Sequence, residues 1–278
     1  MTSVLPERRD LALLAPEAGL ADTVRWAVGH AVLAPSLLNS QPWLFRAELD
    51  GPAGVGRLEL YLDRHRVLER LDPDGREAVL ACGAALLALR LALRAAGLGS
   101  TLRLAPDPAA PDLLAVLVLH GTVRERPDEL LLRGAMAARA TWRTPFLATP
   151  IPADLLDHLV AEAAYEGALL AVLDDGQAGQ LVVLGSADDS RGALVRAGCG
   201  LQRLLLSATA HGLAGRFVDE VMRDEDTRAA VGRTAGLDHP QVLLRLGFPA
   251  PGNPPVEVTA RRPVDDVLHL VAARRGDP

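Results

Sequence analysis

The stretch Ala34-Pro35-Ser36-Leu37-Leu38-Asn39-Ser40-Gln41-Pro42-Trp43-Leu44-Phe45 decides how the first part of the chain folds. A helical run, 22–33, leads into it. Pro35 ends that helix, because proline lacks the N–H that a helix needs and restricts the residue before it. Trp43 and Phe45 are two residues apart, so a strand places both side chains on one face. The stretch therefore predicts a helix stop, a polar turn and the start of a strand.

Length and composition favour a large core without crosslinks. The chain has 278 residues, of which 49% are hydrophobic and only 3% aromatic. This length allows one large domain or two small ones, with a core made mainly of Leu, Ala and Val. The two cysteines, Cys82 and Cys199, lie in apolar helical runs, so we expect buried thiols. No Cys/His spacing suits a zinc ion, and we expect no metal site.

The charge pattern argues against nucleic acid and membrane partners. The formal net charge is −6, and the basic residues are scattered among acidic ones. The first ten residues are polar and lack the apolar centre of a signal peptide. The apolar run 86–98 is interrupted by Arg90 and Arg94, which favours a buried helix over a membrane span. We expect a soluble cytoplasmic protein.

Hydrophobic periodicity and turn signals predict alternating helices and strands. Asp22 is the predicted N-cap of the first helix, and Gly97 the predicted end of the second. Residues 1–20 are expected to form a loose leader with a short helical piece, and 50–56 and 249–255 to form loops. Helices are predicted at 23–33, from 76 to 96, and at 129–140, 154–166, 192–211 and 264–271. Strands are predicted at 43–49, 57–62, 113–119, 168–173, 181–184 and 242–246.

The two halves of the chain resemble each other. Residues 83–98 align with 198–213 without a gap, and each is a Leu/Ala-rich helix that ends in Gly-Leu. The order of helix, strand and Asp-Gly turn before these helices is also shared. The alternative is that Leu/Ala-rich helices look alike by composition alone. We interpret the chain as a duplicated unit folded into a single-chain pseudo-dimer, with halves at 1–125 and 126–278.

A second polar motif, Arg139-Ala140-Thr141-Trp142-Arg143-Thr144-Pro145-Phe146, follows the midpoint of the chain. Two guanidinium groups four residues apart would lie on one side of a helical turn, where both could bind one phosphate. The Thr141 hydroxyl adds a donor for the same anion. The alternative is a pair of exposed helix arginines with no ligand.

Together these motifs resemble the FMN-dependent nitroreductase family. The loop at 35–43 matches its Pro-Ser-x-x-Asn-x-Gln-Pro-Trp motif, and 139–143 matches its Arg-x-Ser/Thr-x-Arg/Lys motif. Near the C-terminus, Arg261 and Arg262 precede a proline as in the family's closing basic motif, although Thr259 replaces its lysine. The order of these motifs, with Leu-Asp-Pro-Asp-Gly-Arg-Glu at 71–77, is similar to that of the Acg-like actinobacterial flavoproteins.

The resemblance implies an α+β, three-layer nitroreductase-like fold with mixed sheets flanked by helices. It also implies one FMN per chain, bound between the two halves. The phosphate ligands would come from the second half and the ring contacts from the first, and the related second site would be empty or degenerate. The implied phosphate ligands are Arg139, Thr141, Arg143, Arg261 and Arg262, and the implied ring contacts are Pro35, Ser36, Leu37, Asn39 and Gln41.

Three functions agree with this reading. The first is an FMN oxidoreductase, in which the flavin carries the redox chemistry, NADH or NADPH is the reductant and no side-chain acid or base is needed. Its partner would be a small organic substrate, and the duplication favours a monomer. The second is an FMN-sequestering protein with little reductase activity. The third is a scaffold without flavin, against which the retained arginines argue. The short 174–180 turn favours the first.

Overall fold

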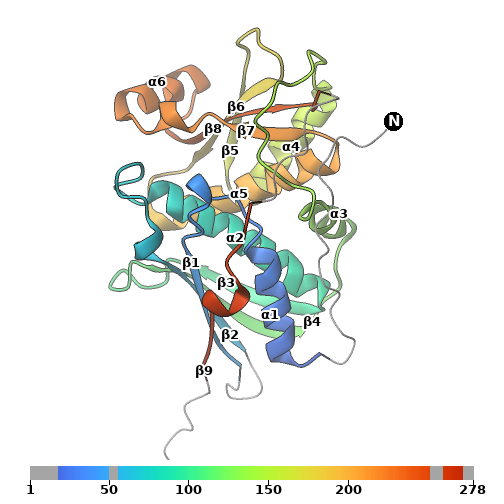
Figure 1. Cartoon of the computed structure of the whole chain (residues 1–278), viewed down its shortest axis with the longest axis vertical. Helices are drawn as coiled ribbons and strands as arrows, with labels where there is room; N and C mark the ends of the chain where they lie inside the picture. The colour runs from blue at the N-terminus through green and yellow to red at the C-terminus, as the bar shows by residue number, and fades with distance from the viewer. Residues whose placement is uncertain (1–17, 50–55, 251–258, 272–278) are drawn as a thin grey trace, which may run out of the picture.

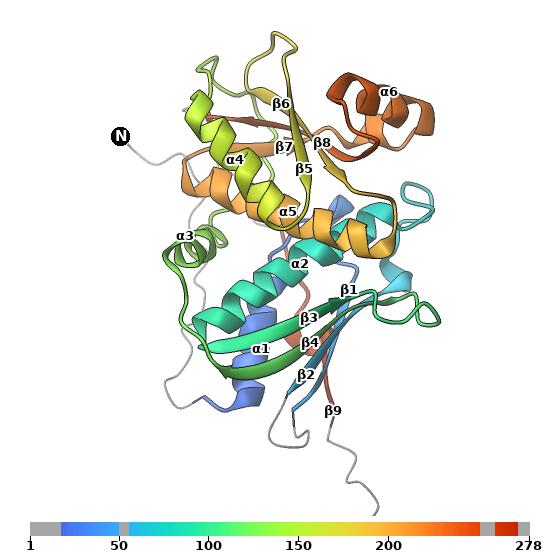
Figure 2. The same ribbon diagram turned by 180° about the vertical axis from the view of Figure 1, so that it is seen from behind.

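Two long helices, α2 (Arg76–Ala95) and α5 (Arg191–Ala210), cross at the centre of the molecule, and each half of the chain supplies one (Figures 1 and 2). The computed structural model describes residues 18–49, 56–250 and 259–271. An ideal Cβ on Gly83 would lie 2.3 Å from the Val195 carbonyl oxygen, and one on Gly198 would lie 2.1 Å from that of Leu80. The two helix backbones therefore touch at a point where only glycine fits.

One sheet lies on each side of this helix pair (Figure 2). The larger sheet has the order β3-β4-β2-β1-β9, and its pairs are antiparallel except for β1 with β9. Its strands are β1 (Trp43–Glu48), β2 (Arg57–Leu62), β3 (Leu98–Leu104), β4 (Leu113–Thr122) and β9 (Leu268–Val271). The smaller sheet is antiparallel throughout, with the order β5-β6-β8-β7. Its strands are β5 (Leu169–Leu173), β6 (Gln180–Ser186), β7 (Ala214–Phe217) and β8 (His239–Gly247).

Shorter helices complete the layers around the sheets (Figure 1). They are α1 (Leu20–Ala31), α3 (Pro127–Ala135), α4 (Ala153–Tyr165) and α6 (Glu225–Ala235). Four single 3₁₀ turns are also present among the described residues: η1 (Leu37–Asn39), η3 (Arg64–Arg66), η4 (Asp219–Met222) and η5 (Val264–Asp266). The α+β class with a mixed sheet flanked by helices is thus confirmed.

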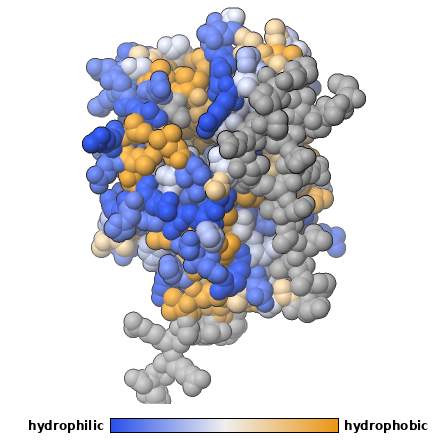
Figure 3. Space-filling model, in the orientation of Figure 1, coloured by the Kyte–Doolittle hydropathy of each residue, from blue (hydrophilic) through white to orange (hydrophobic). Residues whose placement is uncertain are grey.

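Burial follows the sequence pattern closely. Trp43 and Phe45 are both fully buried on one face of β1, as predicted. Both cysteines are buried free thiols, and burial, the main cause, raises the pKa of Cys199 to about 12. Helix α2 is long and apolar enough to cross a membrane, but 83% of its apolar stretch is buried inside the fold. The apolar surface of α2 therefore packs in the core. On the face of the molecule seen in Figure 3, hydrophilic residues alternate with hydrophobic patches.

Several predicted boundaries are wrong at helix ends. Helix α1 begins at Leu20, and its N-cap is Gly19 rather than Asp22, because Leu20 already packs against the core. Helix α3 covers 127–135 rather than 129–140, since Pro127 at its first position fixes a helical φ and starts it early. Most of the predicted leader at 1–20 and of the predicted loops at 50–56 and 249–255 lies outside the described residues.

The C-terminal prediction is wrong in type. Residues 264–271 were expected to form a helix, but only η5 is helical and Leu268–Val271 forms β9. Strand β9 pairs in parallel with β1, so the end of the chain returns to the sheet built from its beginning. Strands β3 and β7 and helix α6 were not predicted at all.

An ion-pair network joins α3 to α5. The Asp128 carboxylate accepts hydrogen bonds at 3.0 Å from Arg126 and from Arg203, whose side chain is 3% exposed. Arg203 also pairs with Glu162 at 2.7 Å, and its guanidinium lies 4.1 Å from the centre of the Tyr165 ring. The hydrogen bond from Arg126 is the main cause that lowers the pKa of Asp128 to about 2, with Arg203 contributing.

We expect Asp128→Asn to reduce stability at neutral pH and to lose this effect in acid. A carboxyl with a lowered pKa in the folded state stabilises above its unfolded pKa, and this stability is lost as the pH falls through the folded value. Because the side chain is 42% exposed, we expect only about 0.5–1 kcal/mol at pH 6. The difference in free energy of unfolding from the wild type should close between roughly pH 4 and pH 2.

Urea unfolding followed by circular dichroism at several pH values measures this difference. Asp157→Asn is the control, since Asp157 is exposed on α4 and has no hydrogen bond or ion pair among the described residues. A difference for Asp128→Asn that stays constant down to pH 2 would contradict the expected linkage.

Candidate functional site

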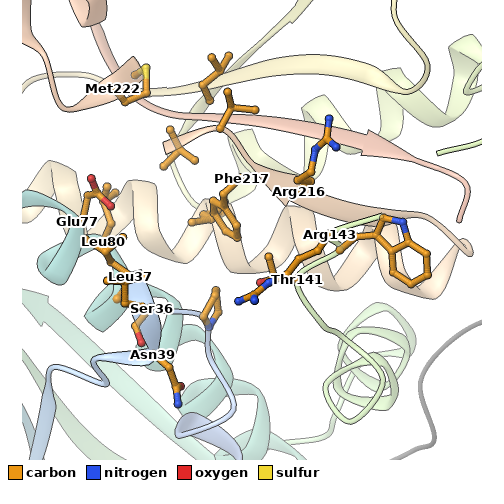
Figure 4. A pocket seen from close by; sticks show the side chains of 18 of the residues that line it. Ser36, Leu37, Asn39, Glu77, Leu80, Thr141, Arg143, Arg216, Phe217 and Met222 are labelled. Carbon is orange, nitrogen blue, oxygen red and sulfur yellow. The ribbon is translucent and has the colours of Figure 1, made fainter. Parts of the chain in front are cut away.

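A cavity of about 1030 Å³ opens between the helix pair and the smaller sheet. Its lining comes from the loop 35–39, the first two turns of α2, the segment 137–144, the strands β7 and β8, the segment 218–223 and residues 259 and 261. In Figure 4, Met222 and Glu77 lie at one end, Arg143 and Thr141 at the other, and Phe217 between them. Residues far apart in the sequence therefore meet in one space.

The loop 35–41 forms one side of this cavity in an unusual backbone conformation. Leu38, Asn39 and Gln41 have φ values of 45°, 58° and 52°, which non-glycine residues rarely adopt. The Ser36 hydroxyl accepts a hydrogen bond from the Gln41 N–H at 3.0 Å, and the Ser36 carbonyl accepts one from the Asn39 N–H at 3.0 Å. Such strain persists only where the surroundings fix it, and it is commonest at binding sites.

The C-terminal segment fixes this loop. The Asn39 amide donates to the Ala260 carbonyl at 2.9 Å and accepts from the Arg261 guanidinium at 3.0 Å. The Gln41 side chain accepts from the Arg262 N–H at 2.7 Å. These contacts place the Arg261 side chain in the lining of the cavity.

Gln41 and Arg262 themselves do not line the cavity. Gln41 is 5% exposed, and Arg262 donates to the Asp63 carboxylate at 3.2 Å and to the Asp266 carbonyl at 2.9 Å. Both residues hold the loop and the C-terminal segment together behind the lining. The grouping of these two residues with direct ligands is therefore not supported by their positions.

The arginine motif lies on extended chain rather than on a helical turn, so that part of the prediction is wrong. Helix α3 ends at Ala135, and Thr141 forms a parallel bridge with Gly215 of β7. The backbone N–H of Trp142 donates to the Gly215 carbonyl at 2.8 Å, and the Trp142 ring is buried against Phe146. Pairing with β7 and burial of the indole pull this segment out of helical geometry.

The two arginines consequently differ in environment. Arg139 is 7% exposed and donates to the Leu33 carbonyl at 3.4 Å. Arg143 is exposed, and the structure gives its guanidinium no hydrogen bond or ion pair with any described residue. The Thr144 hydroxyl, which also lines the cavity, is buried without a hydrogen-bond partner among the described residues. This end of the cavity therefore has donors available for a ligand.

The lining is electrostatically positive. It contains six arginines and two glutamates. Arg139, Arg143, Arg216 and Arg261 come from 139–143, β7 and the C-terminal segment, whereas Glu77 and Glu220 come from α2 and η4. Guanidinium groups match phosphate and carboxylate geometry, so the cavity suits an anionic group at the Arg143 end.

Eight of the ten sequence-predicted site residues line the cavity together: Pro35, Ser36, Leu37, Asn39, Arg139, Thr141, Arg143 and Arg261. Their role as FMN ligands stays a prediction. Sequence reasoning missed Arg216 and Phe217, because β7 has only four residues and was not recognised as a strand. It also missed the segment 218–223 and the place of Arg76 and Glu77 in the lining.

Comparisons with known proteins find relatives that are named as nitroreductases. No family model matches the chain. A Mycobacterium tuberculosis protein named "Putative NAD(P)H nitroreductase acg" is 29% identical over 325 residues, which cover 90% of this chain and 96% of the relative. A second M. tuberculosis protein, also named "Putative NAD(P)H nitroreductase", is 29% identical over 323 residues, with 89% of this chain and 91% of the relative covered.

A solved structure supports the fold. The crystal structure of "a putative nitroreductase" from Anabaena variabilis superposes with a TM-score of 0.60 and covers 85% of this chain and 90% of its own. The sequence identity is 12%, so this likeness concerns the fold alone.

Proposed function

The chain is a relative of the Acg-like branch of the nitroreductase family, and on this premise we propose that it is an FMN-dependent oxidoreductase. It would use NADH or NADPH to reduce a small organic molecule, as the names of its mycobacterial relatives suggest for them. The observation that carries the proposal is the meeting of three distant stretches, 35–39, 139–143 and 259–261, around one cavity.

The residues present fit FMN. The Arg143 guanidinium has no partner among the described residues, and with Thr141 and Arg261 in the same lining it offers charged and hydroxyl donors for a phosphate. Phe217 lies in the middle of the cavity, and Leu80 and other apolar side chains also line it, which suits a flat ring system. The volume lies at the upper end of the roughly 300–1,000 Å³ typical of ligand pockets.

In this proposal each group of residues has a task. Arg139, Arg143, Thr141 and Arg261 bind the phosphate, and the strained loop 35–39 holds the ring against α2. Gln41 and Arg262 position the loop and Arg261. FMN held there would supply the two-electron redox chemistry between the nicotinamide reductant and the acceptor. No side-chain acid or base is required.

We further propose that the halves 1–125 and 126–278 are duplicated units with one flavin between them. A single site is supported because the place in the second half that matches the loop 35–43 reads Glu166-Gly167-Ala168, without its motif, and borders only a smaller cavity of about 340 Å³. The Arg90–Glu166 ion pair, at 2.7 Å, borders this smaller cavity. A chain of this kind is expected to work as a soluble cytoplasmic monomer without nucleic acid or membrane partners.

Purified protein tests the proposal directly. We expect a yellow protein that releases one FMN per chain, identified by mass spectrometry. Under anaerobic conditions NADH or NADPH should bleach the flavin absorbance, and an added quinone should restore it. A yellow protein that neither nicotinamide bleaches would indicate FMN sequestration instead. A colourless protein that FMN does not turn yellow would refute both flavin functions.

A further inference from the structure

The end of the cavity away from Arg143 is bounded by the segment 218–223, which lies between β7 and α6. Its own sheet holds part of it, since the Val218 N–H donates to the Leu243 carbonyl at 2.9 Å. Met222 is 3% exposed and packs with Val183 and Leu243. The segment 218–223 thus forms one wall of the cavity and faces the start of α2, as Met222 faces Glu77 in Figure 4. We call the space between this wall and the start of α2 the opening.

Two neighbouring residues at the start of α2 reach across the opening to this wall. One Arg76 nitrogen donates to the Met222 carbonyl at 3.3 Å, and the other donates to the Gln241 carbonyl at 2.5 Å and to its side-chain oxygen at 3.2 Å. The Glu77 carboxylate lies 3.7 Å from the Arg223 guanidinium. The planar fork of an arginine suits such simultaneous bonds to two strands of chain.

The backbone before these residues fixes their direction. Asp72 is 5% exposed, and its carboxylate accepts hydrogen bonds from the N–H groups of Glu77 and Ala78 at 3.0 and 2.9 Å. Gly75 has a φ of 69°, a conformation that glycine adopts without strain. The sequence Leu-Asp-Pro-Asp-Gly-Arg-Glu at 71–77 therefore aims the Arg76 and Glu77 side chains at the second half of the chain.

The far side of the Arg76 contact is also fixed. The Gln241 side chain is 1% exposed and donates to the Ser186 hydroxyl at 2.9 Å and to Asp189 at 2.6 Å. Asp189 in turn lies 3.5 Å from Arg228 of α6. Arg76 thus links α2 to a fixed support on β8 and, at the same time, to the segment 218–223.

We propose that Arg76 and Glu77 are positioning residues that hold the segment 218–223 close to α2 and so set the largest acceptor that the cavity admits. That the admitted molecule is an electron acceptor rests on the proposed function, whereas the contacts of Arg76 and Glu77 do not depend on the cofactor. Val218 and Met222 bind the segment to its own sheet, whereas among the described residues the Arg76–Met222 hydrogen bond and the Glu77–Arg223 ion pair join it to α2. Their loss widens the opening while the sheet stays intact.

Arg76→Met removes the hydrogen bonds but keeps a long side chain, and Arg76→Lys keeps the charge with a single donating group. Arg64→Met is the matched control, because Arg64 pairs with Asp112 on the surface and does not line the cavity. In Arg76→Met we expect faster hydrogen exchange in a peptide that covers 218–223. We expect Arg76→Lys to lie between this variant and the wild type, and Arg64→Met to match the wild type.

Binding of two quinones measures the width of the opening. Quenching of tryptophan fluorescence gives dissociation constants for unsubstituted 1,4-naphthoquinone and for a naphthoquinone with a bulky side group, since Trp142 lines the cavity. The preference for the small quinone should fall about fivefold or more in Arg76→Met, as expected for the loss of hydrogen bonds from a charged donor. A general loss of stability would weaken the binding of both quinones alike and leave the ratio of their dissociation constants unchanged.

The outcomes separate the two ideas. If Arg76→Met leaves hydrogen exchange in 218–223 or the ratio of dissociation constants unchanged, the proposed role of Arg76 is overturned even if the protein reduces quinones. A changed ratio in a protein that neither NADH nor NADPH reduces would support the wall and refute the proposed function. With turnover present, the ratio of kcat/KM for the two quinones should shift in the same direction as binding.

Discussion

Replacement of Arg143 by alanine is expected to weaken FMN binding by about 1–3 kcal/mol, or roughly 5- to 150-fold, without lowering the stability of the apoprotein. The guanidinium is exposed and has no partner among the described residues, so its removal breaks no contact within the protein. A charge-assisted contact to phosphate is lost in the complex alone. Titration of apoprotein with FMN, followed by quenching of flavin fluorescence, measures the effect.

Arg139→Ala provides the contrast. Arg139 is buried and bonded to the Leu33 carbonyl, so its removal is expected to lower both FMN affinity and the thermal midpoint of the apoprotein. Arg103→Ala is the control, because Arg103 is an exposed arginine of β3 outside the cavity. Equal affinities for Arg143→Ala, Arg103→Ala and the wild type would remove the assigned phosphate site.

Gly198→Ala is expected to destabilise the protein by about 3 kcal/mol or more, which is the largest effect we expect on folding. The added Cβ would lie 2.1 Å from the Leu80 carbonyl oxygen and 2.9 Å from the Gly83 Cα, and both are backbone atoms that cannot rotate away. Helices α2 and α5 would have to separate along their whole contact. Gly83→Ala should act similarly, since its Cβ would lie 2.3 Å from the Val195 carbonyl oxygen.

Gly192→Ala tests the same chemical change in the same helix. An ideal Cβ on Gly192 meets no atom within 4 Å. Alanine there should be neutral or stabilise by up to about 1 kcal/mol, because it restricts the unfolded chain and favours helix. Chemical denaturation of the three variants gives the comparison. Similar free energies of unfolding for Gly198→Ala and Gly192→Ala would show that the helices tolerate separation.

The parts of the fold that the sequence predicted well are those with strong local signals. Helices α2 and α5 carry long apolar repeats, and both are followed by glycines, Gly97 and Gly212, with φ values of 81° and 77°. Strand β1 shows strict alternation around Trp43 and Phe45. In these segments, local preference and tertiary packing favour the same structure.

The missed elements depend on contacts that periodicity does not reveal. The residues 264–271 carry apolar side chains at helical spacing, yet Leu268–Val271 is a strand because the edge of β1 offers hydrogen bonds to it. Helix α6 was missed because its eleven residues include only one that is buried, Gly232, and show no apolar stripe. In both cases the tertiary environment decides the structure.

The candidate site divides in the same way. The motifs predicted which stretches meet, and they do meet around one cavity. They did not separate Arg143, which lines the cavity without a partner in the described part of the chain, from Gln41 and Arg262, which bind each other behind the lining. Residue identity alone cannot distinguish a ligand from its support, since both kinds of position require polar groups with several hydrogen bonds.

The return of β9 to β1 has a consequence for synthesis on the ribosome. Strand β1 is made early, but its outer edge stays unpaired until Leu268–Val271 emerges. An open strand edge is a template for association with other chains. Arg261, which precedes β9, also reaches Asn39 only at that stage. A nascent chain would therefore need protection of this edge until residues 268–271 have been synthesised, and the wall of the pocket that Arg261 supplies would form only then.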